Sequence, residues 1–329
     1  MKKTLVLLLT ILMVFASVAA CAEETIATKT PEKDPYKDPI KIAWIPCEAE
    51  AANGAGWGEG IRRELSNYSN VTFNIFDGEN SADTQTSVIY DLINQDYDAI
   101  ILQAYDSAAL AAPVREAEEA GIPVICINID ASTPHAGLVS MTDYEAGYAI
   151  ANQIGAALNG TGKVVELTMQ VGSSRSENLS DGFYDCIDAN WPELEVLDSQ
   201  VANGQTEMGI QVMNDFITAY GEEIDAVFAH NDASAEGAAQ ACQAAGISDF
   251  LIWGANGETK ALNYIEQGLM TGTIYTNIYD QGATAARLAM MYIGGNIDTS
   301  TFTQTPLIKM APIAVTIDNV ASIAEADRW

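Results

Sequence analysis

From Ile40 onward, short apolar runs that have the composition of β-strands alternate with longer segments that have helical periodicity. Gly121-Ile122-Pro123 marks one junction, where a helix ends and a strand begins directly. Such alternation predicts parallel sheets with helices on both faces. One set of units ends near Met141 and a second begins at Tyr144. We therefore expect an α/β fold with two Rossmann-like lobes, their parallel sheets flanked by helices, facing each other across a cleft.

One strand runs straight into adjacent polar side chains. Ile224–Ala229 is apolar apart from Asp225, as expected of a strand buried on both faces of a parallel sheet, and a helix rich in alanine follows at Ala233. In open α/β sheets, ligands bind outside the carboxyl ends of the strands. Asn231 is therefore predicted to face the cleft, whereas Asp232 is expected either to cap the helix or to contact the ligand. His230 alternates with Asn231 and is expected to face the opposite side in a structural role.

The N-terminal segment has the pattern of an export signal. A basic start is followed by the apolar run Leu5–Ala20, which is too short and too close to a processing site to be a membrane span. Val18-Ala19-Ala20-Cys21 resembles the lipobox of bacterial lipoproteins, in which the cysteine is acylated. We predict a signal peptide over residues 1–20 and a lipid-anchored linker over residues 21–39, which place the protein outside the cytoplasm on the cell membrane.

Charge and cysteine spacing exclude several kinds of partner. The chain has 15 basic and 45 acidic residues, a formal net charge of −30, so nucleic acid and anionic lipid headgroups are poor partners. No Cys-x-x-Cys pair occurs, and neither a metal site nor a cofactor is predicted. A disulfide stays possible by sequence alone, but free thiols are expected at Cys47, Cys126, Cys186 and Cys242.

Several motifs occur in the order and at the spacing of a known family. From Ile40 to the C-terminus the chain resembles the ribose-type periplasmic sugar-binding proteins of ABC transporters. The motifs that carry the resemblance are Gly121-Ile122-Pro123-Val124-Ile125, Tyr144-Glu145-Ala146-Gly147, Gly162-Lys163-Val164-Val165-Glu166-Leu167, Val227-Phe228-Ala229-His230-Asn231-Asp232 and Gly254-Ala255-Asn256-Gly257.

The resemblance implies the type I periplasmic binding protein fold, a hinged pair of lobes joined by three crossings near Thr142, Thr276 and Leu307. The N-terminal lobe would comprise residues 40–142 and 277–306. The C-terminal lobe would comprise residues 143–276 and 307–329, in which we expect one extended segment over Leu307–Ile317. That segment is expected to cross back toward the first lobe and pair with a strand.

The resemblance also implies ligand-binding positions in the cleft. Gln103 stands where the family often has an asparagine, Asn128 and Asn256 stand where it has aspartates, and Thr276 falls where a glutamine is common. Asn231 matches the family directly.

The chain also departs from the family. Ile129 and Leu179 occupy the positions of cleft arginines, so the site is expected to keep amides and lose charges. Arg175, which precedes a helix expected over Ser180–Asn190, is a candidate substitute from a different turn. Amides donate and accept hydrogen bonds, which suits the hydroxyls of a neutral ligand.

Three further candidates lie in loops that follow strands. Trp57 is expected to begin a helix over Trp57–Tyr68, and either ring stacking on a ligand or packing in the core fits its position. Asn53 lies in the loop before that helix, expected over Cys47–Gly56. Tyr105 follows Gln103 and is expected either at the rim of the cleft or in contact with the ligand.

These observations predict a monomeric solute-binding lipoprotein that captures a neutral sugar or polyol and delivers it to an ABC transporter permease. An alternative with the same fold is a sensor subunit that presents ligand to a chemoreceptor or kinase. An exported enzyme fits less well, because the glycines of Gly54–Gly60 do not complete a G-x-G-x-x-G fingerprint. With His135 and His230 as the only histidines and no G-x-S-x-G motif, no nucleophile–base pair is indicated.

Overall fold

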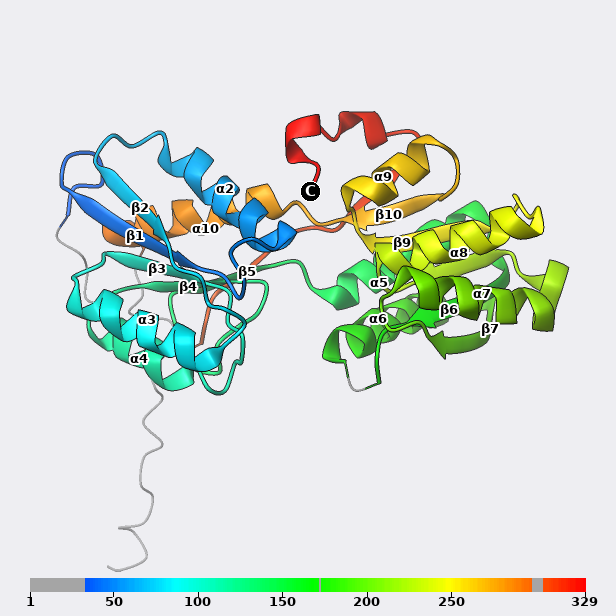
Figure 1. Ribbon diagram of the computed structural model, residues 1–329, viewed down its shortest axis with the longest axis horizontal. Helices are drawn as coiled ribbons and strands as arrows, with labels where there is room; N and C mark the ends of the chain where they lie inside the picture. The colour runs from blue at the N-terminus through cyan, green and yellow to red at the C-terminus, as the bar shows by residue number, and fades with distance from the viewer. Residues whose placement is uncertain (1–32, 172, 298–303) are drawn as a thin grey trace, which may run out of the picture.

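The computed structural model describes residues 33–171, 173–297 and 304–329. The predicted signal peptide and Cys21 lie outside the described residues. Two lobes lie side by side, each built on a six-stranded sheet (Figure 1). The α/β class and the two-lobe type I periplasmic binding protein architecture predicted from the sequence are confirmed.

The first lobe contains an all-parallel sheet with strand order β11-β5-β4-β3-β1-β2. Its strands are β1 (Ile40–Ile45), β2 (Val71–Ile75), β3 (Ala99–Leu102), β4 (Val124–Ile127), β5 (Gly137–Ser140) and β11 (Leu307–Lys309). Its helices are α2 (Ala52–Leu65), α3 (Ala82–Asn94), α4 (Ala111–Glu119) and α10 (Ile278–Ile293). β3 and β4 are buried along their whole length because helices cover both faces of the sheet.

The second lobe contains a sheet with strand order β12-β10-β9-β8-β6-β7, in which only the edge strand β12 is antiparallel. Its strands are β6 (Thr161–Thr168), β7 (Glu193–Val201), β8 (Ala226–Ala229), β9 (Leu251–Asn256), β10 (Gly272–Tyr275) and β12 (Ile313–Thr316). Its helices are α5 (Asp143–Ala157), α6 (Ser174–Asn190), α7 (Thr206–Tyr220), α8 (Asp232–Ala245) and α9 (Thr259–Glu266). The 3-10 turns are η1 (Gly221–Glu223), η2 (Val320–Ser322) and η3 (Glu325–Asp327).

The lobes are joined where β5 leads into α5, where β10 leads into α10, and where β11 leads into β12 (Figure 1). The third crossing differs from the prediction. Instead of one extended segment, Leu307–Ile317 forms two short strands that pair in different sheets. The predicted boundary at Leu307 is wrong, because Leu307–Lys309 pairs with β5 of the first lobe before the chain crosses.

The C-terminal segment returns over the junction of the lobes (Figure 1). Arg63 of α2 donates to Asp327 at 2.8 Å, whereas Arg328 donates to Glu266 of α9 at 2.7 Å. Trp329 packs against the hydrophobic cores of both lobes. This segment therefore contacts both lobes beside the crossings.

The four cysteines in the described part of the chain are free, as the sequence predicted. None of the helices in the described ranges has the length and hydropathy needed for a membrane span.

Candidate functional site

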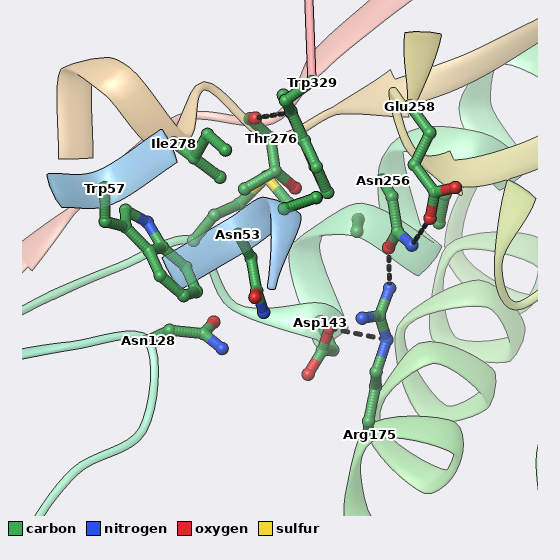
Figure 2. Close-up of a pocket in the computed structure, with 14 residues that line it drawn as sticks. Asn53, Trp57, Asn128, Asp143, Arg175, Asn256, Glu258, Thr276, Ile278 and Trp329 are labelled. Atoms are coloured by element: carbon green, nitrogen blue, oxygen red, sulfur yellow. Dashed lines mark hydrogen bonds and ion pairs between the residues drawn. The ribbon is translucent and has the colours of Figure 1, made fainter. Parts of the chain in front are cut away.

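A cavity of about 350 Å³ lies between the two lobes (Figure 2). Both lobes and the crossings contribute to its wall. The lining residues are Ala52, Asn53, Trp57, Asn128, Met141, Asp143, Ala146, Arg175, Ala255, Asn256, Glu258, Thr276, Ile278 and Trp329. The volume is at the lower end of the range for small-molecule pockets.

Three of the predicted residues form the wall on the first lobe: Asn53, Trp57 and Asn128. Trp57 is only 2% exposed, and its indole Nε1 donates to Gln281 of α10 at 2.7 Å. Its ring also packs edge-on against Trp44 with centroids 6.3 Å apart, so its orientation is fixed by packing. Helix α2 begins before Trp57, at Ala52, so Asn53 lies in its first turn and not in a loop as predicted.

Asn128 follows β4 and adopts a left-handed backbone conformation, with φ of 65°. Asparagine tolerates this region better than most residues because its side chain bonds locally. The turn places Asn128 at the cavity, opposite the second lobe (Figure 2).

Arg175 is the central charged group of the wall on the second lobe (Figure 2). Its guanidinium donates to the side-chain oxygen of Asn256, and its Nε lies 3.5 Å from Asp143 Oδ1. The Asn256 amide donates in turn to Glu258 at 2.9 Å. Burial raises the pKa of the Asp143 carboxyl, and the nearby Arg175 charge opposes part of that rise. The second lobe thus presents a chain of linked polar groups.

The prediction that the site loses its charges is wrong. Asp143, Arg175 and Glu258 all line the cavity, and Arg175 supplies a guanidinium one turn before Leu179, whose own side chain is buried. The difference arises because α6 begins at Ser174, whereas the sequence predicted a start at Ser180.

The N-terminus of α6 is held by groups distant in sequence. Ser173 caps the helix by accepting from Ser176 N at 3.4 Å. Ser176 Oγ lies 2.8 Å from Nδ1 of the buried His230, which follows β8. These contacts fix the first turn of α6 and therefore the base of the Arg175 side chain.

Asp232 positions the loop that carries Asn256. Its Oδ2 accepts from the backbone N–H groups of Gly257 and Glu258, both at 2.8 Å, and its Oδ1 accepts from the Thr273 hydroxyl at 2.6 Å. Asp232 is fully buried, and burial raises the pKa of its carboxyl to about 7. Asp232 therefore contacts neither the cavity nor the end of its own helix, the two roles weighed for it from the sequence.

Asn231 caps α8, contrary to the prediction that it faces the cleft. Its Oδ1 accepts from Ser234 N at 3.1 Å, and its Nδ2 donates to Gly204 O at 2.9 Å. With both ends of its amide bonded locally, Asn231 does not line the cavity.

Gln103 and Tyr105 also lie outside the cavity wall. Gln103 is buried, and its Oε1 accepts from Cys47 N at 3.1 Å, so it ties two loops of the first lobe together. The Tyr105 side chain is exposed, and its backbone N–H donates to Gln85 at 2.9 Å.

The structure brings Asn53, Trp57, Asn128, Asn256 and Thr276 together around the cavity. Sequence reasoning missed Asp143, Glu258 and Trp329. Asp143 begins the helix directly after a predicted crossing, and Glu258 follows the carboxyl end of β9, so both positions carried a usable signal. No sequence signal pointed to Trp329, because it reaches the cavity only where the C-terminal segment returns to the crossings. There its indole Nε1 donates to Thr276 O at 3.1 Å.

Sequence comparison identifies relatives with known names. A family described as periplasmic binding protein domain matches residues 42–297. The xylitol-binding protein of Mycolicibacterium smegmatis is 31% identical over 245 residues, which cover 74% of this chain and 70% of that protein. The ribose import binding protein of Bacillus subtilis is 32% identical over 201 residues, which cover 61% of this chain and 64% of that protein.

Solved structures show the same fold. A sugar-binding protein of a Bacillus halodurans ABC transporter superposes with a TM-score of 0.78 at 17% identity, covering 86% of this chain and 99% of that one. The myo-inositol binding protein of Caulobacter superposes with a TM-score of 0.68 at 22% identity, covering 89% and 97%.

Proposed function

Because the chain belongs to the periplasmic binding protein family, we propose that it captures a neutral sugar or polyol between its lobes and delivers it to an ABC transporter permease. The observation that carries this proposal is the cavity itself, since both lobes supply hydrogen-bonding groups to one space of about 350 Å³. Relatives named for xylitol and ribose support a small polyhydroxy ligand.

The polar groups of the cavity suit hydroxyls. The amides of Asn53, Asn128 and Asn256 both donate and accept. Arg175 donates, and the carboxylate of Glu258 accepts. Trp57 adds a rigid apolar edge to the wall, with only 2% of its surface exposed.

The charges of the wall favour a neutral ligand. Two carboxylates, Asp143 and Glu258, accompany one guanidinium, Arg175, which leaves one negative charge in formal terms. Arg175 is already bonded to Asn256 and lies beside Asp143. An anionic ligand would therefore be buried beside surplus negative charge, with part of the Arg175 charge already offset by Asp143, which costs free energy.

Closure of the lobes would complete the site. Asn53, Trp57 and Asn128 belong to the first lobe, whereas Arg175, Asn256 and Glu258 belong to the second. A ligand that bonds to both sets is buried fully only when the lobes approach each other, by rotation about the crossings. The closed form would then be the one that the permease recognises.

A calorimetric screen of neutral sugars, deoxy sugars, polyols and inositols tests this function. We expect one of these compounds to bind, and its uronic acid counterpart to bind at least tenfold more weakly. Preference for a uronic acid or an amino acid would overturn the proposed ligand class.

We also propose that the protein is anchored outside the cytoplasm through acylated Cys21, on the basis of Val18-Ala19-Ala20-Cys21. Cys21→Ala should move the protein from the membrane fraction to the soluble fraction, because a lipid chain contributes about 0.8 kcal/mol of membrane binding per buried CH₂ group. Fractionation with immunoblotting measures this shift, and Cys47→Ala serves as the control. Mass spectrometry that finds an unmodified Cys21 in the membrane-bound protein would contradict the proposal.

A further inference from the structure

A second group of potential ligand atoms lies in the first lobe, away from the cavity lining. Cys126 is in β4, and Asp130 and His135 are in the loop between β4 and β5. The thiol sulfur, one carboxylate oxygen and one imidazole nitrogen all lie within 4.8 Å of one another. Cys126 and His135 are completely buried, and the Asp130 side chain is 44% exposed. Among the described residues, no other His, Cys, Asp and Glu side chains form such a cluster.

The imidazole of His135 is oriented for a metal. Its Nδ1 lies 2.9 Å from the carbonyl oxygen of Thr133, which can only accept, so Nδ1 carries the proton. Nε2 then presents its lone pair to the cluster. It is buried and lies 3.1 Å from Asp130 Oδ1, an ion-pair distance, but among the described residues no group is aligned to form a hydrogen bond with it. Buried polar atoms are rarely left unpaired.

The surroundings hold His135 in place. Glu118 Oε1 accepts from Val124 N and from Ala136 N, both at 2.8 Å, and Ala136 directly follows His135. Glu118 Oε2 is itself buried without a partner among the described residues. The Thr133 carbonyl that accepts from Nδ1 is the kind of outer contact that commonly orients a metal-binding histidine.

We propose that Cys126, Asp130 and His135 bind Zn²⁺, with the fourth position left to water. A thiolate, an imidazole and a carboxylate form a mixed ligand set that zinc accepts. Zinc–nitrogen and zinc–oxygen bonds of about 2.0–2.2 Å place two tetrahedral ligands about 3.3–3.6 Å apart. The observed separation of 3.1 Å between His135 Nε2 and Asp130 Oδ1 is slightly shorter, so the two side chains would move apart by a few tenths of an ångström to bind the ion.

The site differs from what the sequence predicted. No metal was expected, because the chain has no Cys-x-x-Cys pair. The ligands instead come from the end of a strand and from a loop that folds back over it, a pattern with no fixed sequence spacing.

Zinc would also stiffen the loop that carries Asn128, since that residue lies between Cys126 and Asp130 in the chain. This second effect rests on the proposed function of the cavity, whereas metal binding does not. Zinc binding and the sugar-binding function can be disproved independently, because the zinc content of the protein is measured without any sugar present.

The test measures zinc bound to the purified full chain. The protein is stripped with a chelator, dialysed against Zn²⁺ in excess Mg²⁺ to suppress binding to the acidic surface, and analysed by elemental mass spectrometry. We expect one zinc per chain and an affinity at least tenfold lower in Cys126→Ser, His135→Gln and Asp130→Asn. Cys186→Ser and Cys242→Ser, which alter other buried thiols, should keep the metal. Substitution with Co²⁺ should produce a thiolate charge-transfer absorption that Cys126→Ser abolishes.

Circular dichroism establishes which variants fold. Asp130→Asn changes a partly exposed side chain and should fold. Its zinc affinity therefore tests the proposal even if the variants at the buried positions Cys126 and His135 do not fold. The proposal is overturned if the parent retains no zinc, or if Asp130→Asn and every folded variant of Cys126 and His135 bind zinc as tightly as the parent.

Discussion

Replacing His230 with alanine is expected to lower the free energy of unfolding by about 3–5 kcal/mol, because it leaves a buried carboxylate without its partner. His230 and Glu166 are 0% and 1% exposed, and Nε2 lies 2.8 Å from Glu166 Oε1. The hydroxyls of Ser180, Tyr184 and Ser199 also donate to this carboxylate, at 2.7, 3.0 and 2.6 Å, and would be its remaining partners. Urea unfolding followed by circular dichroism measures the loss.

The size of this loss should depend on pH. Burial of Glu166 opposes its ionisation, but the contacts with His230, Ser199 and Ser180 outweigh burial and hold the pKa of the carboxyl below its ordinary value of 4.5. A lowered carboxyl pKa stabilises the fold above the ordinary value, and this contribution is lost as pH falls through the folded-state value. The difference between the parent and His230→Ala should therefore be larger above the ordinary carboxyl value than below about pH 4.

Lys163 provides a matched control on the same strand. It pairs with Glu223 at 2.5 Å, but both side chains are exposed, so Lys163→Ala should lower the free energy of unfolding much less than His230→Ala does. The double variant His230→Ala/Glu166→Gln should lose less free energy of unfolding than the sum of the two single losses. Glu166→Gln removes the buried negative charge that His230→Ala leaves without its imidazole partner. An unfolding free energy of His230→Ala within 1 kcal/mol of the parent's, about the effect of an exposed pair, would show that the buried pair is not stabilising.

Asn256→Gly should weaken ligand binding by about tenfold to a hundredfold, or about 1.4–2.7 kcal/mol. The Asn256 amide bridges Arg175 and Glu258 in the cavity wall. Its loss would remove the proposed ligand contact, take the amide donor from Glu258 and leave Arg175 with Asp143 as its neighbour in the wall. Glycine is chosen because Asn256 has φ of 142°, a conformation in which alanine would add backbone strain. Calorimetry with the neutral compound that binds best in the screen measures the change.

Two other asparagines separate binding from stability. Asn263→Ala removes an exposed amide from α9 and should change neither property. Asn231→Ala removes the cap of α8 and should cost about 1 kcal/mol of stability while leaving affinity within about twofold of the parent's. Unchanged affinity in Asn256→Gly together with weakened binding in Asn231→Ala would mean that the ligand lies closer to β8 than the cavity indicates.

Local patterns predicted many elements well. Ile224–Ala229 was predicted as a buried strand, and the observed β8 begins slightly later, at Ala226, and ends at Ala229 with every residue buried. The alanine-rich helix predicted from Ala233 begins at Asp232 and ends at Gly246 in a left-handed conformation. Apolar runs and glycine stops act over a few residues, so their signal is readable without knowledge of the partner elements.

Helix α6 shows where local patterns fail. The serine-rich segment before Ser180 has weak helix propensity, and the predicted helix therefore began too late. In the structure, Ser176 reaches His230, which is 54 residues away in sequence, and the helix extends back to Ser174. The same extension delivers Arg175 to the cavity.

The sequence by itself determined the order of strands and helices, the two-lobe α/β class and the strand ends at which polar residues gather, because these follow from periodicity and from junction residues. Only the tertiary structure decided which of those polar side chains face the cavity. Asn231 bonds to its own helix, Asp232 bonds to Gly257, 25 residues away, and Trp57 is fixed by Gln281, 224 residues away. A buried polar side chain must form hydrogen bonds with the groups that lie next to it in the folded protein. Those groups often belong to segments distant in sequence, so local sequence patterns do not predict them.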